Sequence, residues 1–402
     1  MSDTQKNKKP NVPNLRFPGF EGEWEQHLLS EYLDFKNGLN PSAKSFGEGI
    51  KFISVMDILN NPFITYDCIR ASVNATEKEK QEFNVEYGDI LFQRSSETLE
   101  DVGHANVYLD SRTALFGGFT IRGKKKGVYN PLFFKYLLDS PTARKKVIVK
   151  GAGAQHFNIG QEGLSKVVLS FPSIQEQNRI AVFMNLLDQR ISIQNKVIED
   201  LKCVKESITR RLINQKDESS RIVTLGEITE IVSRRNKNKE NYPMYSVTND
   251  KGFVPQEELF EDREMVGEDI GVYKIVLKDE IAYNPARINV GSIGQYTGDS
   301  PCMISSLYVC IKARKGIDSK WLIQILRSEH LVYYYNLYAE GGVRLYLFYP
   351  NFSRIRVTLP PLEQQSRIAA ILGQIENKIK LESSILSGYR QTKQALLCKL
   401  FV

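Results

Sequence analysis

The chain has 402 residues, which is enough for two or more domains with separate cores. Its apolar share of 42% is typical of a globular protein, and no stretch approaches the roughly 18 consecutive apolar residues of a membrane span. The net charge of +7 permits a polyanionic partner without establishing one.

The first part of the chain is predicted to form a polar leader and a globular domain. Residues 1–16 are basic and polar, so we expect a disordered leader. The aromatic residues that follow, around a Pro-Gly turn and ending at Trp24, indicate a clip that docks the N-terminal segment. Short β-like runs then alternate with turns, and a helix is expected from Pro131 to about Lys150. We assign the first α+β domain to residues 17–172.

The same order of elements recurs in the second half. Short β-like runs precede an expected helix near Ser319 to Tyr338, and we assign the second domain to residues 217–360. Each domain is followed by a long helical segment, residues 173–216 and 361–402. These segments align without a gap at a constant shift of 188 residues. A long segment that returns in fixed register indicates a duplicated unit.

The two helical segments carry a heptad pattern, with apolar residues alternately four and three positions apart. Two seam positions are polar in both copies, Gln194 with Glu382 and Lys205 with Lys393. A parallel pair would place the two lysines together on the seam, which is unfavourable. An antiparallel pair instead places Gln194 against Lys393 and Lys205 against Glu382. We therefore predict an antiparallel coiled coil within one chain and a pseudo-twofold internal repeat.

The sequence lacks the motifs of several enzyme classes. It contains no phosphate-binding loop, no dinucleotide-binding glycine motif and no zinc-protease or hydrolase motif. Asn284-Pro-Ala-Arg287 resembles the catalytic motif of adenine methyltransferases only faintly, since the second proline and the aromatic residue are missing. The five cysteines form no C-x-x-C pair, so we expect neither a disulfide framework nor a metal site, and a cytoplasmic location.

Polar and glycine-containing loops favour a nucleic-acid partner instead. Gly151 to His156 and Ala339 to Arg344 fall at matched positions, directly after the expected helix of each domain, where glycine would let the backbone approach a groove closely. Taken alone, each loop is explained about equally well as a solvated turn and as a nucleic-acid contact. The candidate DNA-binding residues are Arg94, Ser95, Lys124, Lys125, Gly153, Gln155, His156, Arg234, Arg235, Asn284, Arg287, Gly342 and Arg344.

Arg179 and Arg367 recur at the starts of the two helical segments. They are candidates either for binding a partner or for bracing the helices against the globular domains, and we favour the bracing role. The candidate partner and coiled-coil residues are Arg179, Gln194, Lys205, Arg367, Glu382 and Lys393.

These features together resemble the specificity subunit of type I restriction-modification systems. The resemblance rests on two diverged domains, on the Gln-x-Arg-Ile-Ala helix starts at Gln177 and Gln365, and on the Phe-Pro-Gly-Phe-x-Gly-Glu-Trp segment ending at Trp24. It implies two target-recognition domains that each read one half of a bipartite double-stranded DNA target. It also implies that the paired helices set the spacing and dock methyltransferase subunits, two of them in the complex.

The resemblance further implies a chain without catalysis or cofactors of its own. S-adenosylmethionine would belong to the methyltransferase subunits, and ATP and Mg to restriction and motor subunits. No membrane partner is expected. Two other interpretations of the residues remain open: a degenerate DNA adenine methyltransferase, and a coiled-coil scaffold whose heads bind proteins.

Overall fold

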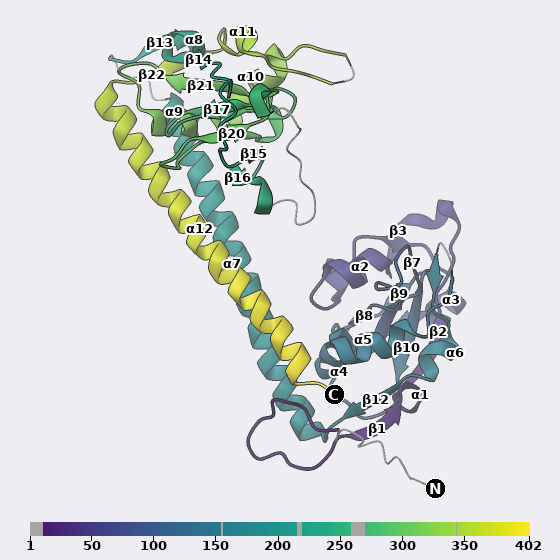
Figure 1. Cartoon of the computed structure of the whole chain (residues 1–402). Helices are drawn as coiled ribbons and strands as arrows, with labels where there is room; N and C mark the ends of the chain where they lie inside the picture. Colours follow the sequence, from purple (N-terminus) through teal and green to yellow (C-terminus); the bar gives the residue numbers. More distant parts are fainter. Residues whose placement is uncertain (1–10, 154–155, 215–218, 259–269, 343) are drawn as a thin grey trace. The chain divides into compact units, whose positions relative to one another are not determined.

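The computed structural model describes residues 11–153, 156–214, 219–258, 270–342 and 344–402. The chain divides into two compact units. The first contains residues 1–195 and 384–402, and the second contains residues 196–383. Each unit combines a globular head with a stretch of both long helices (Figure 1). The chain thus mixes helices and strands in two repeated units, as predicted.

The first head is built on two four-stranded sheets. The strands of the first sheet, in spatial order, are β2 (Leu33–Asn37), β10 (Thr120–Lys125), β6 (Ile90–Gln93) and β8 (Ala105–Val107). Those of the second are β4 (Ser72–Val73), β3 (Phe46–Ile53), β9 (Ala114–Phe116) and β5 (Asn84–Val85). All four residues of β6 are buried, as expected for a strand at the centre of a sheet covered on both faces.

Shorter elements complete the first head. Two two-stranded sheets pair β1 (Glu25–Leu28) with β12 (Val168–Phe171) and β7 (Ser95–Ser96) with β11 (Phe157–Asn158). The helices are α1 (Leu29–Tyr32), α2 (Val55–Asn60), α3 (Glu77–Glu82), α4 (Pro131–Asp139), α5 (Pro141–Ile148) and α6 (Gln161–Ser165).

The second head repeats the central sheet of the first. Its strands, in spatial order, are β14 (Thr229–Val232), β21 (Val309–Ala313), β18 (Ile281–Tyr283) and β19 (Ile293–Gln295). Three antiparallel pairs join β13 (Arg221–Thr224) to β22 (Arg356–Leu359), β15 (Tyr245–Thr248) to β16 (Gly252–Pro255), and β17 (Lys274–Val276) to β20 (Cys302–Ile304). The helices are α8 (Leu225–Ile228), α9 (Ser319–Leu326), α10 (Glu329–Tyr338) and α11 (Tyr349–Phe352).

The single helix predicted in each head is in fact two. In the first head, the Ser140 side chain accepts a hydrogen bond from the amide of Ala143 at 3.2 Å and so caps a new helix, α5, whose first residue is a proline. In the second head, Ser328 caps α10 in the same way, through the amide of Leu331 at 3.4 Å. A capping serine therefore begins the second helix at both positions, and in the first head the same serine also ends the first helix.

The long helices α7 (Ile174–Asn214) and α12 (Leu362–Lys399) run antiparallel within each unit. In the first unit Asp188 pairs with Lys393, and Asn195, further along α7, accepts from Arg390, which lies earlier on α12. In the second unit Ile208 and Leu212 pack in the same core as Ile368 and Leu372. The predicted heptad residues of both helices are all buried or half-buried, so the direction and the seam are confirmed.

The predicted polar partners across the seam were wrong by six residues. Lys393 pairs with Asp188 rather than with Gln194, and Lys205 pairs with Glu376 rather than with Glu382, both at 2.6 Å. Glu382 forms an ion pair with Lys378 of its own helix. The lysine side chains are long enough to leave the seam for carboxylates that also contact a head.

The N-terminal clip docks within the first unit, as predicted. Trp24 is 2% exposed and packs edge-on against the rings of Phe133 and Phe401. The amide of Leu15 donates to the carbonyl of Lys399 at 2.9 Å, and Arg16 forms an ion pair with Glu176 at 2.8 Å. The prediction of a disordered leader was therefore wrong for residues 11–16, whereas residues 1–10 lie outside the described residues.

Among the described residues, no helix is both long enough and apolar enough to cross a membrane.

Candidate nucleic-acid interface

The two glycine loops, at residues 151–156 and 339–344, match in the part that the structure describes, which leaves out residues 154, 155 and 343. Each closes with an antiparallel bridge, Ala152 to Asn158 in the first and Glu340 to Tyr346 in the second. Gly153 and Gly341 adopt φ angles of +145° and +133°. A Cβ at these positions would lie 2.0 Å and 2.1 Å from the carbonyl oxygen of the residue three positions later. Only glycine fits this conformation, so the loop shape is a shared feature of both heads.

In the first head the glycine loop lies beside the loop that carries Arg94 and Ser95. Strands β7 and β11 pair here, the Ser95 hydroxyl is hydrogen-bonded to the side chain of Asn158, and the amide of Ile159 donates to the carbonyl of Arg94 at 3.0 Å. Four predicted residues thus come together, namely Arg94, Ser95, Gly153 and the exposed His156. Gln155 lies outside the described residues.

The second head has the equivalent arrangement. The amide of Leu347 donates to the carbonyl of Pro285 at 2.9 Å, which joins the glycine loop to the Asn284–Arg287 turn. Asn284 accepts from the amide of Ala286 at 3.0 Å and holds this turn closed. Arg287, Gly342 and Arg344 are exposed. The second head therefore presents the same pair of loops with different side chains.

The other predicted basic residues do not join these loops. Lys124 and Lys125 lie at the opposite end of the sheet from Arg94, because β10 runs antiparallel to β6 with Thr120 opposite Gln93. Lys124 approaches Glu86 at 3.8 Å, and the ammonium of Lys125 lies 4.9 Å from the ring centre of Tyr129.

Arg234 and Arg235 also lie outside the pair of loops. The guanidinium of Arg234 contacts both carboxylate oxygens of the buried Glu280 at 3.2 Å, so its charge is compensated within the head. Arg235 is exposed and pairs through its backbone with Lys274.

Gln177 and Gln365 brace the helix starts, a role that sequence reasoning gave to the neighbouring arginines. Gln177 is buried, donates to the carbonyl of Pro172 at 2.9 Å and accepts from the amide of Asn130 at 3.1 Å. Gln365 makes the same two bonds, to Pro360 and Asp318, both at 2.9 Å. The signal was present in the sequence, since both glutamines occupy the same place in the repeated segment.

Arg179 and Arg367 are exposed at these helix starts. The guanidinium of Arg179 lies 5.7 Å from the ring centre of Phe17. Their role in partner binding stays a prediction.

Two polar triads fasten the helices to the heads. In the first triad, Asp188 accepts from the Tyr136 hydroxyl at 2.9 Å and from Lys393. In the second, Glu376 accepts from the Gln324 amide at 2.8 Å and from Lys205. Burial would raise the pKa of Glu376, but the hydrogen bond and charge of Lys205 outweigh it, and the pKa is lowered overall. Each residue of the first triad lies 188 positions from the corresponding residue of the second triad.

A family model identifies this duplicated arrangement. The model, described as the type I restriction modification DNA specificity domain, matches residues 21–202 and again residues 218–388. The chain belongs to this family.

Two relatives from Methanocaldococcus jannaschii match over most of their length. The protein named as the type I restriction enzyme MjaX specificity subunit is 22% identical, with 97% of this chain and 95% of the relative covered. The MjaVIII specificity subunit is 21% identical with the same coverage.

Solved structures agree on the fold. The S subunit of a type I restriction-modification system from M. genitalium has a TM-score of 0.59 at 16% identity and covers 97% of this chain and 99% of that one. A chain from a study of assembly and conformational transition in the type I R-M system has a TM-score of 0.55 at 15% identity, with 93% and 96% covered. At these identities the likeness concerns the fold alone.

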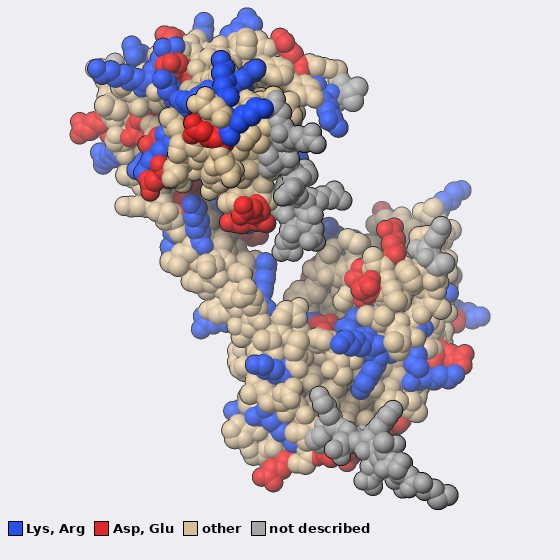
Figure 2. Space-filling view, in the orientation of Figure 1, with Lys and Arg blue, Asp and Glu red and all other residues tan. Residues whose placement is uncertain are grey.

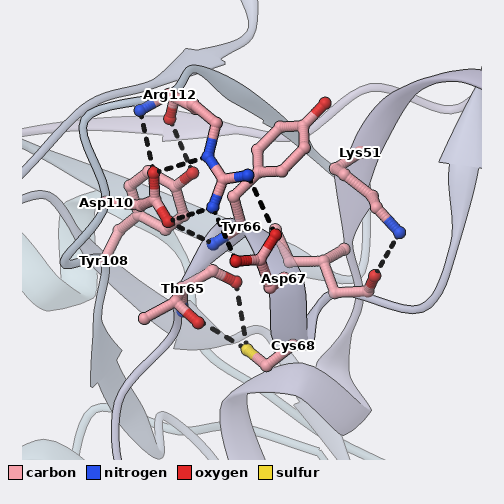
Figure 3. Close-up of polar contacts among 9 residues, drawn as sticks. Lys51, Thr65, Tyr66, Asp67, Cys68, Tyr108, Asp110 and Arg112 are labelled. Atoms are coloured by element: carbon pink, nitrogen blue, oxygen red, sulfur yellow. Dashed lines mark hydrogen bonds and ion pairs between the residues drawn. The ribbon is translucent and has the colours of Figure 1, made fainter.

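Not every charged cluster of the first specificity domain is available to a ligand. Figure 3 shows Arg112 between Asp67 and Asp110 and over the ring of Tyr66. Its guanidinium donates to both carboxylates at distances of 2.9 to 3.0 Å. The hydrogen bonds from Arg112 hold the pKa of Asp110 well below its ordinary value. Arg112 therefore closes a surface loop and leaves no free guanidinium edge for a phosphate.

Charge on the two specificity domains is mixed rather than segregated in the face seen in Figure 2. Lys and Arg side chains are interspersed there with Asp and Glu on both heads. Affinity for DNA therefore does not come from one broad basic face on this side, and contacts from particular loops are needed instead. Within the described residues, no group of three or more His, Cys, Asp or Glu is placed to hold a metal ion.

Proposed function

We propose that this chain is the DNA-reading subunit of a type I restriction-modification complex, and that each head reads one half of a bipartite double-stranded target. The observation that carries the proposal is the glycine loop beside a polar loop in each head, with the same closing bridge, the same glycine conformation and different side chains. Two readers that share a docking mode but have separate targets require this combination, because backbone contacts position a protein on DNA whereas side chains read bases.

We further propose that the helix pair sets the unread gap between the half-sites and docks two methyltransferase subunits. Helix α7 supports docking, since Val182, Leu186 and Ile193 are more than half exposed along it. Apolar side chains gathered on one exposed surface are typical of a site for a protein partner.

In this proposal the chain supplies recognition and geometry but no catalysis, and it acts in the cytoplasm. S-adenosylmethionine is expected on the methyltransferase subunits, and ATP and Mg on the restriction and motor subunits. The purified chain with S-adenosylmethionine and target DNA should transfer no methyl group. Transfer should appear only when a methyltransferase subunit is added.

The decisive experiment is a methylation map. The chain is expressed with a type I methyltransferase subunit in a host that lacks other systems, and modified adenines are located by direct sequencing. We expect two short defined sequences separated by a fixed undefined gap. If the complex assembled but modified no adenine, the DNA-reading proposal would lose its support and a scaffold function would replace it.

A further inference from the structure

The second head contains a hollow beside one of the two loops described above. Its volume is about 410 Å³, and it lies between the turn that joins β15 to β16 and the Asn284–Arg287 turn. All of its lining residues except Val247 have side chains with hydrogen-bonding groups. The lining includes Thr248, Asn249, Asp250, Arg287, Ser292 and Tyr308.

Hydrogen bonds between β15 and the side chains of Ser292 and Tyr308 hold the turn between β15 and β16 in place. The Ser292 hydroxyl donates to the carbonyl of Val247 at 2.7 Å, and the amide of Val247 donates to the hydroxyl of Tyr308 at 3.2 Å. Gly252 adopts a φ angle of +70°, and a Cβ at Gly294 would lie 3.0 Å from the Cα of Gly252. The hairpin therefore packs closely on the central sheet, and its turn is presented in one conformation.

The side chains at the rim differ in how they are used. The Asp250 carboxylate is hydrogen-bonded to backbone and side-chain groups of its own turn, and these bonds lower its pKa. Asn249 and Arg287 are exposed, and neither side chain forms a hydrogen bond or ion pair with another described residue. Among the described residues, a carboxamide and a guanidinium on these two turns thus remain without a partner.

We propose that Asn249 and Arg287 read base edges in the major groove of the second half-site, Arg287 contacting a guanine and Asn249 an adenine. The inference rests on the proposed function and assigns residues to it. A two-stranded β-ribbon has the right width for the major groove. A guanidinium matches the two acceptors of guanine, and a carboxamide matches the acceptor and donor of adenine. Asn249 was not visible as a candidate from the sequence.

The test compares variants in the complete methyltransferase complex. Adenine methylation is mapped for the unchanged chain, Arg287→Ala, Asn249→Ala and the control Arg354→Ala, an exposed arginine of the same head that lies away from the hollow. Arg287→Ala should relax one guanine position of one half-site, and Asn249→Ala one adenine position of the same half-site. Each should lose roughly 10- to 100-fold of discrimination at its own position. The other half-site, the gap and the control should be unchanged.

Binding provides a second measurement that needs no methyl transfer. Duplexes with each single base changed in the second half-site compete for the assembled complex. Arg287→Ala should bind the original duplex and the duplex changed at its guanine equally well. A uniform loss over all duplexes, or discrimination retained at every position, would overturn the assignment of these residues. A bipartite motif in the unchanged complex would still support the proposed function, so the two failures are distinguishable.

Discussion

At the scale of single residues, Gly153 and Gly341 carry the backbone shape that the two heads have in common. Their positive φ angles and the close carbonyl oxygens leave no space for a side chain. The neighbouring Gly342 differs, because a Cβ there would meet no atom within 4 Å and its φ angle is not positive. The chain thus contains its own control for the effect of adding one methyl group.

We expect Gly153→Ala and Gly341→Ala to weaken DNA binding by the complete complex about tenfold, since a left-handed alanine costs about 1–2 kcal/mol and the loop must move. Gly342→Ala, which adds a methyl group to the same loop without straining the backbone, should weaken binding less than Gly341→Ala does. Affinity is measured by duplex competition at fixed salt, with urea unfolding as a check on the fold. Equal affinity for all four proteins would remove the glycine loops from the interface.

The glycine loops could be predicted from the sequence, but the basic residues that join them could not. The glycine loops could be predicted because glycine is favoured where the backbone adopts a conformation that other residues avoid. Lys124 and Arg234 were candidates because of their charge alone, and charge does not predict where a residue lies in the fold. Lys124 lies beside Glu86 at the far end of a sheet, and Arg234 binds Glu280. Asn249 was missed because a turn some 40 residues before Arg287 in sequence reaches it only through the fold.

At the scale of elements, the two polar triads predict how the long helices are held. The side chains of Lys205 and Glu376 are 23% and 25% exposed. Lys205→Met leaves the carboxylate without its cation and should lower the free energy of unfolding by about 1–3 kcal/mol in a urea titration. Lys312→Met, which breaks an ion pair with Glu230 whose two side chains are 47% and 48% exposed, should change it by less than about 0.5 kcal/mol. A similar loss for both would mean that the triad adds nothing.

The same triad predicts a dependence on acid. The folded pKa of Glu376 lies below its ordinary value of 4.5, so its contribution is complete above that pH and is lost as the pH falls through the folded pKa. Glu376→Gln should therefore lower stability at neutral pH and flatten its fall under acid conditions. Glu199→Gln, an exposed site on α7, should leave the acid profile unchanged. An identical acid profile for Glu376→Gln and the unchanged chain would contradict the argument.

The buried glutamines at the helix starts make a separate prediction. Removing either one leaves a backbone amide and a carbonyl without a partner, so Gln177→Ala and Gln365→Ala should each cost about 1–3 kcal/mol. Amide hydrogen exchange should rise at Asn130 and at Asp318 respectively. The neighbours Gln175 and Gln364 are the controls, and their alanine variants should stay within about 0.5 kcal/mol.

The helices were the most predictable elements, and their cross-seam pairs the least. The heptad spacing and the two like-charged lysines were sufficient for an antiparallel pair, because both properties belong to the helices themselves. The partners of Lys205 and Lys393 were not predictable in this way. Each lysine pairs with a carboxylate that also accepts a hydrogen bond from a head residue, Gln324 or Tyr136. The heptad pattern of the helices contains no information on that contact.

At the scale of the whole molecule, each long helix serves both units. Lys205 lies on the helix that follows the first head but completes the triad of the second unit, and Lys393 does the reverse. The duplication at a shift of 188 therefore includes the connections as well as the heads. Neither half of the chain contains all the residues of its own unit, so changes to the helices must be made in both copies to preserve the pairing.

This requirement defines the test of the proposed ruler. Seven residues inserted after Asn195 in α7 and seven after Ser383 in α12 keep the heptad period and lengthen the pair by about 10 Å. At about 3.4 Å per base pair, the unread gap in the methylation map should grow by about three base pairs, with both half-sites unchanged. The same insertion in α7 alone is the control and should impair folding, because the seams no longer match. If the matched insertion changed a half-site and left the gap as it was, the helices would not be what sets the spacing.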